Sequence, residues 1–142
     1  MIDPNVTEFW YLATPYSKYP LGHAEAFKES CVQAGLLLNA GIKVFGPIAH
    51  SHPIAEYGNI NKLDYEMFLG LDVPFLNAAK GIIVCKLDGW DTSYGVTWEI
   101  SHMMDRGKPV IYMEPGIVPD LNCYEAMTVE DWDNYERISA VS

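Results

Sequence analysis

Short apolar segments alternate along the chain with longer segments of helical periodicity, and this alternation limits the folds that are available. The apolar segments, each of strand length, lie at 9–13, 42–45, 81–86 and 110–113. Helical spacing is clearest at 22–39 and 94–106, where apolar residues recur every three or four positions. Such alternation favours a mainly parallel sheet with helices on both faces. We therefore expect an α/β fold, a Rossmann-like or flavodoxin-like three-layer sandwich that forms a single domain over residues 1–142.

The segments between the predicted strands divide into helices and loops. Residues 46–61 are rich in Pro, His, Gly and Asn, which predicts a long loop. Residues 62–71 and 73–79 are predicted to form two helical pieces with a break near Asp72, and a loose capping signal at 128–131 predicts a last short helix. Ligands of parallel sheets bind at the carboxyl ends of the strands. The candidate site therefore lies in the loops at that edge, 14–20, 46–61, 87–93 and 114–125.

Charge and cysteine content argue against several classes of partner and location. Nine Lys and Arg against nineteen Asp and Glu give a formal net charge of −10, which disfavours nucleic acid polymers and anionic membrane surfaces. The apolar runs are far shorter than the roughly 18 residues that a membrane span requires. The start of the chain does not look like a signal peptide, and the three cysteines are widely spaced. We therefore expect a cytoplasmic protein.

The motifs of several large enzyme classes are missing from the sequence. It has no Gly-x-Gly-x-x-Gly after the first strand, no Gly-x-x-x-x-Gly-Lys loop, no Gly-x-Ser-x-Gly and no His-Glu-x-x-His. Dinucleotide redox chemistry, P-loop phosphoryl transfer, serine hydrolysis and zinc proteolysis lose support, and no motif implies a cofactor. His50 and His52 would point the same way in an extended segment, with Glu56 as a third ligand. Structural or base-contacting histidines are commoner than this arrangement, so we expect no metal site.

Glu99 is the first candidate for a catalytic residue. Ser93 can cap a helix that begins at Tyr94, and Glu99 then lies about a turn and a half inside this helix. The helix dipole would help to keep the carboxylate ionised, and an ionised carboxylate is a usable nucleophile. The alternative is a glutamate that merely faces solvent, as most helical glutamates do.

Asp72 is the second candidate. Its simplest role is to cap a helix that begins at Val73, although a capping residue can also take part in catalysis. If Asp72 and Glu99 face the same pocket, the pair has the composition of a retaining glycosidase. One carboxylate would attack the anomeric carbon while a proton donor assists the leaving group.

Several segments at the expected strand ends match a known family. They are Tyr11-Leu-Ala-Thr-Pro-Tyr-Ser17, Phe45-Gly-Pro-Ile-Ala-His-Ser51, Asp72-x-x-x-Leu76 ahead of Gly81-Ile-Ile-Val84, and Ser93-x-Gly-Val-x-x-Glu99 with Gly107-Lys-Pro-Val110. Over most of residues 9–113 the chain resembles the nucleoside 2-deoxyribosyltransferase family. It is most similar to a small branch that also resembles the deoxynucleoside 5′-monophosphate N-glycosidases.

The resemblance implies a reaction at the N-glycosidic bond of a 2′-deoxynucleoside or its 5′-monophosphate. By this resemblance Glu99 would form a deoxyribosyl ester, Asp72 would be the acid that handles the base, and Tyr11 would orient Glu99. Either a second base or water could resolve the ester, so a transferase and a hydrolase both remain open. A nucleotide-sensing module without turnover is a third reading, but recognition of an anionic ligand gains nothing from two carboxylates.

The resemblance also implies substrate-binding residues. The segment with Pro47 and His50 would lie against the nucleobase, and Tyr16 could stack on it. Ser93 stands where transferases of free nucleosides carry Asp, and a hydroxyl there favours a 5′-phosphate, although the first loop lacks the Gly and Arg of a phosphate-binding loop. The family usually assembles as dimers or higher oligomers, so a neighbouring subunit would complete the pocket through the segment around Asn122. The remaining predicted contacts are Thr14, Ser17 and Gly95.

Overall fold

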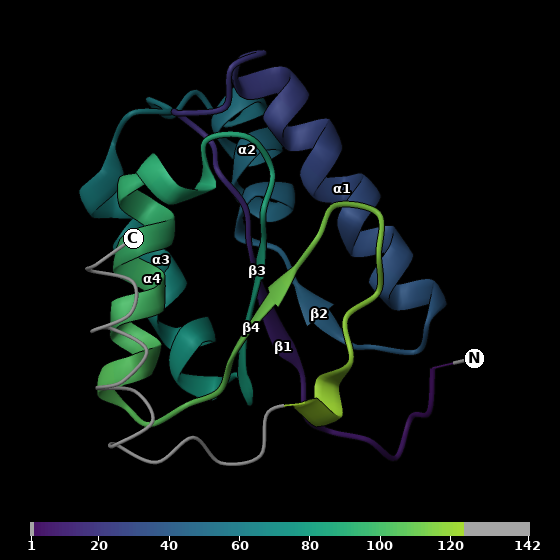
Figure 1. Cartoon of the computed structure of the whole chain (residues 1–142). Helices are drawn as coiled ribbons and strands as arrows, with labels where there is room; N and C mark the ends of the chain where they lie inside the picture. Colours follow the sequence, from purple (N-terminus) through teal and green to yellow (C-terminus); the bar gives the residue numbers. More distant parts are fainter. Residues whose placement is uncertain (1, 124–142) are drawn as a thin grey trace, which may run out of the picture.

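The computed structural model describes residues 2–123, and their arrangement is shown in Figure 1. In this part of the chain one sheet contains four parallel strands in the order β2-β1-β3-β4: β1 (Trp10–Ala13), β2 (Val44–Phe45), β3 (Gly81–Cys85) and β4 (Val110–Met113). The α-helices are α1 (His23–Asn39), α2 (Pro47–Tyr57), α3 (Tyr65–Ala78) and α4 (Tyr94–Asp105). Two short 3₁₀ turns are η1 (Trp90–Thr92) and η2 (Leu121–Cys123). The expected α/β class with a parallel sheet is confirmed.

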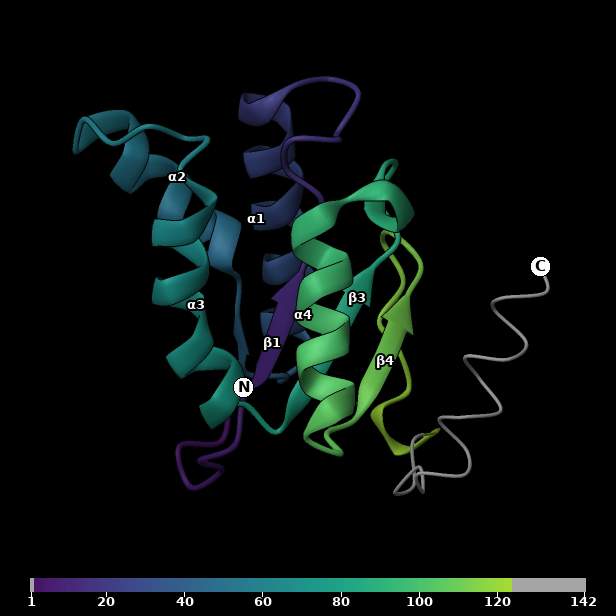
Figure 2. The ribbon, with the colours of Figure 1, turned by 90° about the vertical axis from the view of Figure 1, so that its left-hand side faces the viewer.

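The sheet is covered on both faces, which gives the three layers of a Rossmann-like or flavodoxin-like sandwich. β1 and β3 are buried along their whole length, as expected of strands between two helical layers. Their side chains alternate, so Trp10 and Leu12 pack in the cluster that contains Leu37 of α1, whereas Tyr11 packs in the cluster formed with α3 and α4. Figure 2 shows α3 and α4 in front of the sheet and α1 behind it.

The chain leaves β1 and β3 toward opposite sides of the sheet. β1 leads through α1 to β2, and β3 leads through α4 to β4, so the crevice between their carboxyl ends is the topological switch point at which such sheets bind ligands. Gly89, in the loop after β3, has a φ of 93°. A Cβ at this position would lie 2.4 Å from the carbonyl oxygen of Lys18, so only glycine lets the two loops meet.

The expected long loop at 46–61 is wrong, because most of it is helix α2. Pro47 occupies the first turn, where its missing N–H costs no hydrogen bond. The buried residues Pro47, Ser51 and Ala55 recur every four positions and form one inward face. Pro53 removes a single backbone donor without ending the helix. The proline and histidine content is typical of a loop, but the four-residue spacing of the buried positions is typical of a helix, and the segment folds as a helix.

The expected helix break near Asp72 is also wrong, since α3 is one continuous helix. Asp64 caps it by accepting a hydrogen bond from the Met67 N–H at 3.2 Å. Asp72 therefore lies in the interior of the helix and is not a cap. Pro74 is accommodated inside α3 without ending the helix.

The other expected elements agree with the structure to within about two residues. In α1 the buried positions Ala26, Ser30, Gln33 and Leu37 recur every three or four residues and form one face of the helix, and two of them are polar residues outside the apolar pattern of the sequence. The helix predicted at 128–131 lies outside the described residues. Within residues 2–123, no helix has the length and apolar character that crossing a membrane requires.

Candidate functional site

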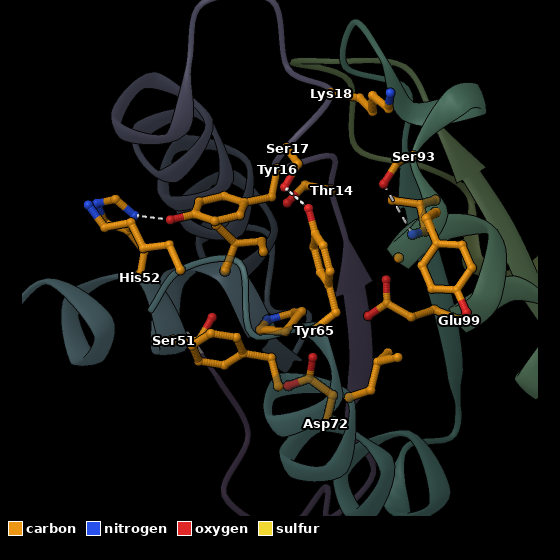
Figure 3. A pocket seen from close by; sticks show the side chains of 18 of the residues that line it. Thr14, Tyr16, Ser17, Lys18, Ser51, His52, Tyr65, Asp72, Ser93 and Glu99 are labelled. Atoms are coloured by element: carbon orange, nitrogen blue, oxygen red, sulfur yellow. Dashed lines mark hydrogen bonds between the residues drawn. The ribbon is translucent and has the colours of Figure 1, made fainter. Parts of the chain in front are cut away.

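A pocket of about 890 Å³, including its open mouth, lies at the carboxyl ends of β1 and β3 (Figure 3). The walls come from the β1–α1 loop, α2, α3 and the start of α4. Most of the predicted site residues line it: Thr14, Tyr16, Ser17, Pro47, Asp72, Ser93, Gly95 and Glu99. The topology thus brings together residues from four separate segments of the sequence.

Glu99 lies on α4 at the base of this pocket and is only 6% exposed. Tyr11 reaches it from β1, because the side chain of Tyr11 points to the face of the sheet that α4 covers. The Tyr11 hydroxyl donates a hydrogen bond to Oε2 of Glu99. Burial raises the pKa of Tyr11 well above 10, so the hydroxyl keeps its proton and acts as the donor.

The expectation that the helix dipole keeps Glu99 ionised is wrong. Burial raises the pKa of Glu99 to about 8, the hydrogen bond from Tyr11 lowers it, and the charge of Asp72 raises it. The dipole acts mainly within the first turn of a helix, and Glu99 lies beyond that turn of α4. Burial is the largest of these effects, so the pKa of Glu99 lies above its usual range.

Asp72 lines the same pocket, so the two carboxyl groups do face one cavity. Burial raises the pKa of Asp72 to about 7, and the nearby hydroxyl of Tyr11 lowers it. Oδ1 of Asp72 is buried and accepts no hydrogen bond from the described residues. With pKa values of about 7 and about 8, the pair of Asp72 and Glu99 holds about one proton between pH 7 and 8.

Two hydroxyl groups line the pocket near the strand ends. Ser93 is buried and caps α4, accepting a hydrogen bond from the Val96 N–H at 3.3 Å, which confirms the expected cap. Thr14 follows β1 and is 4% exposed, and its Oγ1 has no partner within residues 2–123. A buried polar atom normally has a hydrogen-bond partner. Thr14 Oγ1 is therefore suited to bind a polar ligand atom.

The pocket wall opposite α4 is rich in aromatic side chains, and the sequence predicted only some of its residues. The Tyr16 hydroxyl lies 2.6 Å from Nδ1 of His52, and Ser17 Oγ lies 2.8 Å from the hydroxyl of Tyr65. Tyr65 was missed because α3 was divided in two: read as one helix, Tyr65, Leu69 and Asp72 follow the spacing of a single face. Other lining residues that the sequence did not single out are Lys62, Phe68 and Tyr94.

The histidines of α2 do not lie as predicted. His50 is exposed, is not among the lining residues, and instead packs against Phe45 and Phe75 with ring centroids 5.6 and 6.3 Å away. His52 is buried and reaches the pocket wall. Residues two apart in a helix point to different sides, so only one of the two histidines can face the pocket, and it is His52 rather than the predicted His50. Among the described residues, no three His, Cys, Asp or Glu side chains form a group that could hold a metal ion.

Asn122 does not line this pocket. It lies exposed in η2, which sits near the amino ends of the strands, away from the pocket edge of the sheet (Figure 1). Its predicted contribution concerned the pocket of a neighbouring subunit, and that role stays a prediction.

Comparison with known proteins places the chain in a family. No curated protein matches it. A family model matches residues 8–115 and is described as a domain of unknown function, DUF1937. The matched segment extends from just before β1 to just after β4 and so includes every residue that lines the pocket. Because the match covers more than half of the sequence, the protein belongs to the DUF1937 family.

Proposed function

We propose that this protein breaks the N-glycosidic bond of a 2′-deoxynucleoside or its 5′-monophosphate through a deoxyribosyl ester on Glu99. The observation that carries the proposal is the buried carboxyl pair: Asp72 and Glu99 line one pocket and share about one proton near neutral pH. One carboxylate and one carboxylic acid are what glycosidic bond cleavage with a covalent intermediate requires. The substrate class rests on the sequence segments that resemble the nucleoside 2-deoxyribosyltransferases.

In the first step, ionised Glu99 attacks C1′ of the sugar and the bond between C1′ and the base nitrogen breaks. Asp72, as the acid, gives its proton to the departing base. In the resting pair the proton lies mainly on Glu99, which has the higher pKa, so the reactive arrangement is the one in which the proton has moved to Asp72. The hydrogen bond from Tyr11 to Oε2 favours this arrangement, because it stabilises the ionised form of Glu99. The products of this step are the free base and the ester on Glu99.

In the second step, an acceptor resolves the ester. A nitrogen of a second base attacks C1′, the ester bond breaks, and the proton of the incoming nitrogen returns to Asp72. We propose transfer to a base as the main outcome, because a base held beside Asp72 outcompetes water through its effective concentration.

Hydrolysis of a 5′-monophosphate is the second candidate, and Ser93 is the observation that favours it. Ser93 is buried, neutral and part of the pocket lining. A hydroxyl accommodates a phosphate, whereas a carboxylate in this place would repel it. In this version water takes the place of the second base, and free deoxyribose 5-phosphate is the product.

A turnover panel tests the proposal. The protein is incubated with the four common 2′-deoxynucleosides and their 5′-monophosphates, each with and without a second base, and the bases and nucleosides are quantified by chromatography. We expect release or exchange of at least one base, and a loss of about three or more orders of magnitude in Glu99→Gln. Asp105→Asn, which removes an exposed carboxylate from the same helix, is the matched control and should keep full activity. Stable substrates throughout the panel would refute the proposed function.

A further inference from the structure

Two consecutive residues of the β1–α1 loop form hydrogen bonds to two different helices of the pocket wall. Tyr16 contacts His52 of α2, and Ser17 contacts Tyr65 of α3, with a 2.8 Å separation between the Ser17 and Tyr65 oxygens. Figure 3 shows the ring of Tyr65 reaching up to Ser17, with Asp72 below it and Glu99 across the pocket. The Ser17–Tyr65 contact joins segments 48 positions apart in the sequence. We call this contact the latch.

Local structure fixes both ends of the latch. Tyr65 is the first residue of α3, directly after the capping residue Asp64, whose N–H bonds the carbonyl oxygen of Asn61 at 3.0 Å. On the other side, Ser17 precedes Lys18, whose backbone packs against Gly89. The latch is therefore a bond between two supported segments.

Tyr65 lies between the carboxyl pair and solvent. It lines the pocket together with Asp72 and Glu99, yet it is 49% exposed, so its ring borders both the cavity and the outside. A tyrosine whose hydroxyl is bonded to the β1–α1 loop places its apolar ring along this side of the mouth.

We propose that Tyr65, held by Ser17, limits the access of water to the ester on Glu99 and so determines how much of the sugar is transferred to a base and how much is hydrolysed. This role rests on the proposed function. In transfer and in hydrolysis alike, the bond between C1′ and the Glu99 oxygen breaks. Either a base nitrogen or a water oxygen bonds to C1′, and the proton of that nucleophile goes to Asp72. The fates differ only in the nucleophile, so a residue that admits or excludes water changes their ratio without changing ester formation.

Variants that break the latch from each side test this role. Tyr65→Phe removes the hydroxyl but keeps the ring, Ser17→Ala removes the other partner, and the double variant removes both. Tyr57→Phe, at a tyrosine that is 89% exposed on α2 and does not line the pocket, is the matched control. The probe is the panel compound that the wild type consumes fastest, supplied with a saturating labelled base. Free sugar and labelled nucleoside are both quantified, and a melting curve checks the folding of each variant.

Each single variant should raise the ratio of free sugar to labelled nucleoside about two- to tenfold, the range expected for one hydrogen bond. The double variant should match the single variants, because all three lose the same bond. The product ratio of each variant is compared at equal consumption of substrate, and Tyr57→Phe should keep the wild-type ratio. Amide hydrogen exchange at 14–22 should be faster in both single variants.

The outcomes separate the inference from the function on which it rests. Turnover with an unchanged ratio in Tyr65→Phe and Ser17→Ala overturns the role of Tyr65 and leaves the glycosidic reaction standing. If the wild type produces only free sugar, the role of Tyr65 is also overturned, because water then reaches the ester despite the latch. The glycosidic reaction itself would still stand. Absence of all turnover overturns both claims. If amide hydrogen exchange at 14–22 is unchanged in both single variants, the Ser17–Tyr65 contact does not stabilise this loop, and the latch is overturned.

Discussion

The Tyr11 hydroxyl donates a hydrogen bond to Oε2 of Glu99, from the strand at the centre of the sheet to the helix that packs on it. Both side chains are buried. The bond opposes the desolvation of Glu99, since it favours the ionised carboxylate whereas burial favours the neutral acid. It is thus the contact through which the sheet sets the charge of the proposed nucleophile.

Tyr11→Phe should therefore raise the pKa of Glu99 further and lower activity at neutral pH. A hydrogen bond to a charged group contributes about 1.5–3 kcal/mol, so we expect a loss of about 10- to 100-fold in kcat/KM at pH 7. The loss should shrink as the pH is raised and Glu99 ionises. The pH profile of kcat/KM checks this, with Tyr57→Phe as the control. A loss of the same size at every pH would mean that Tyr11 does not act through the ionisation of Glu99.

The pH dependence of wild-type activity follows from the shared proton. Below about pH 7 both carboxyl groups are protonated and the nucleophile is lost, and above about pH 8 both are ionised and the proton donor is lost. We expect a bell-shaped kcat/KM with its maximum between these values. Asp72→Asn should be slower, should lose the alkaline decline, and should shift the acid limb downward because the charge that raises the pKa of Glu99 is gone. A flat profile between pH 5 and 9 would contradict this assignment.

The stability of the fold should fall as the pH rises. This is the opposite of what is expected for carboxylates held in ion pairs, which stabilise a fold more as the pH rises. The folded-state pKa values of Asp72 and Glu99 lie above those of an unfolded chain, so stability is fully present below about pH 4 and is lost as the pH rises through 7 and 8. Glu99→Gln should therefore be more stable than the wild type at pH 8.5, by about 1–2 kcal/mol, and nearly equal to it at pH 4.5. Urea unfolding at the two pH values measures the difference, and Asp105→Asn should show no such dependence. A Gln variant less stable at pH 8.5 would show that ionised Glu99 is favourably held.

Ser93 should decide between free nucleosides and monophosphates. The wild type should accept 5′-monophosphates at least as well as nucleosides, and Ser93→Asp should reverse the preference by placing a negative charge beside the phosphate. Aspartate is also a good helix cap, so α4 should stay intact. Thr92→Asp adds the same charge at the neighbouring exposed position and is the control. If wild type and variant both ignore monophosphates, Ser93 acts as a cap alone.

The succession of strands and helices along the chain and the edge that holds the pocket could be predicted because they depend on strong local signals. β3 is a continuous apolar run and α4 begins at a serine cap, so Glu99 was placed correctly within its helix. Helix α2 could not be identified from composition, because Pro47 and Pro53 are tolerated for reasons of position that a count of prolines does not reveal.

The protonation of the site depends on distant parts of the sequence. The pKa of Glu99 is set by burial, by Tyr11, which is 88 positions away in the sequence, and by Asp72, whereas the expected ionisation considered only the dipole of its own helix. The latch escaped notice for the same reason, since Ser17 and Tyr65 meet only in the folded chain.

Trapping of the ester tests the central claim most directly. A deoxynucleoside with fluorine at C2′ should form the ester on Glu99 and resolve it slowly, because fluorine destabilises the positive charge that develops at C1′ when the ester breaks. Peptide mass spectrometry should then find the mass of one fluorinated sugar on the peptide that contains Glu99, and no label in Glu99→Gln. Label on another carboxylate, or base release with no labelled peptide at any time, would contradict the account.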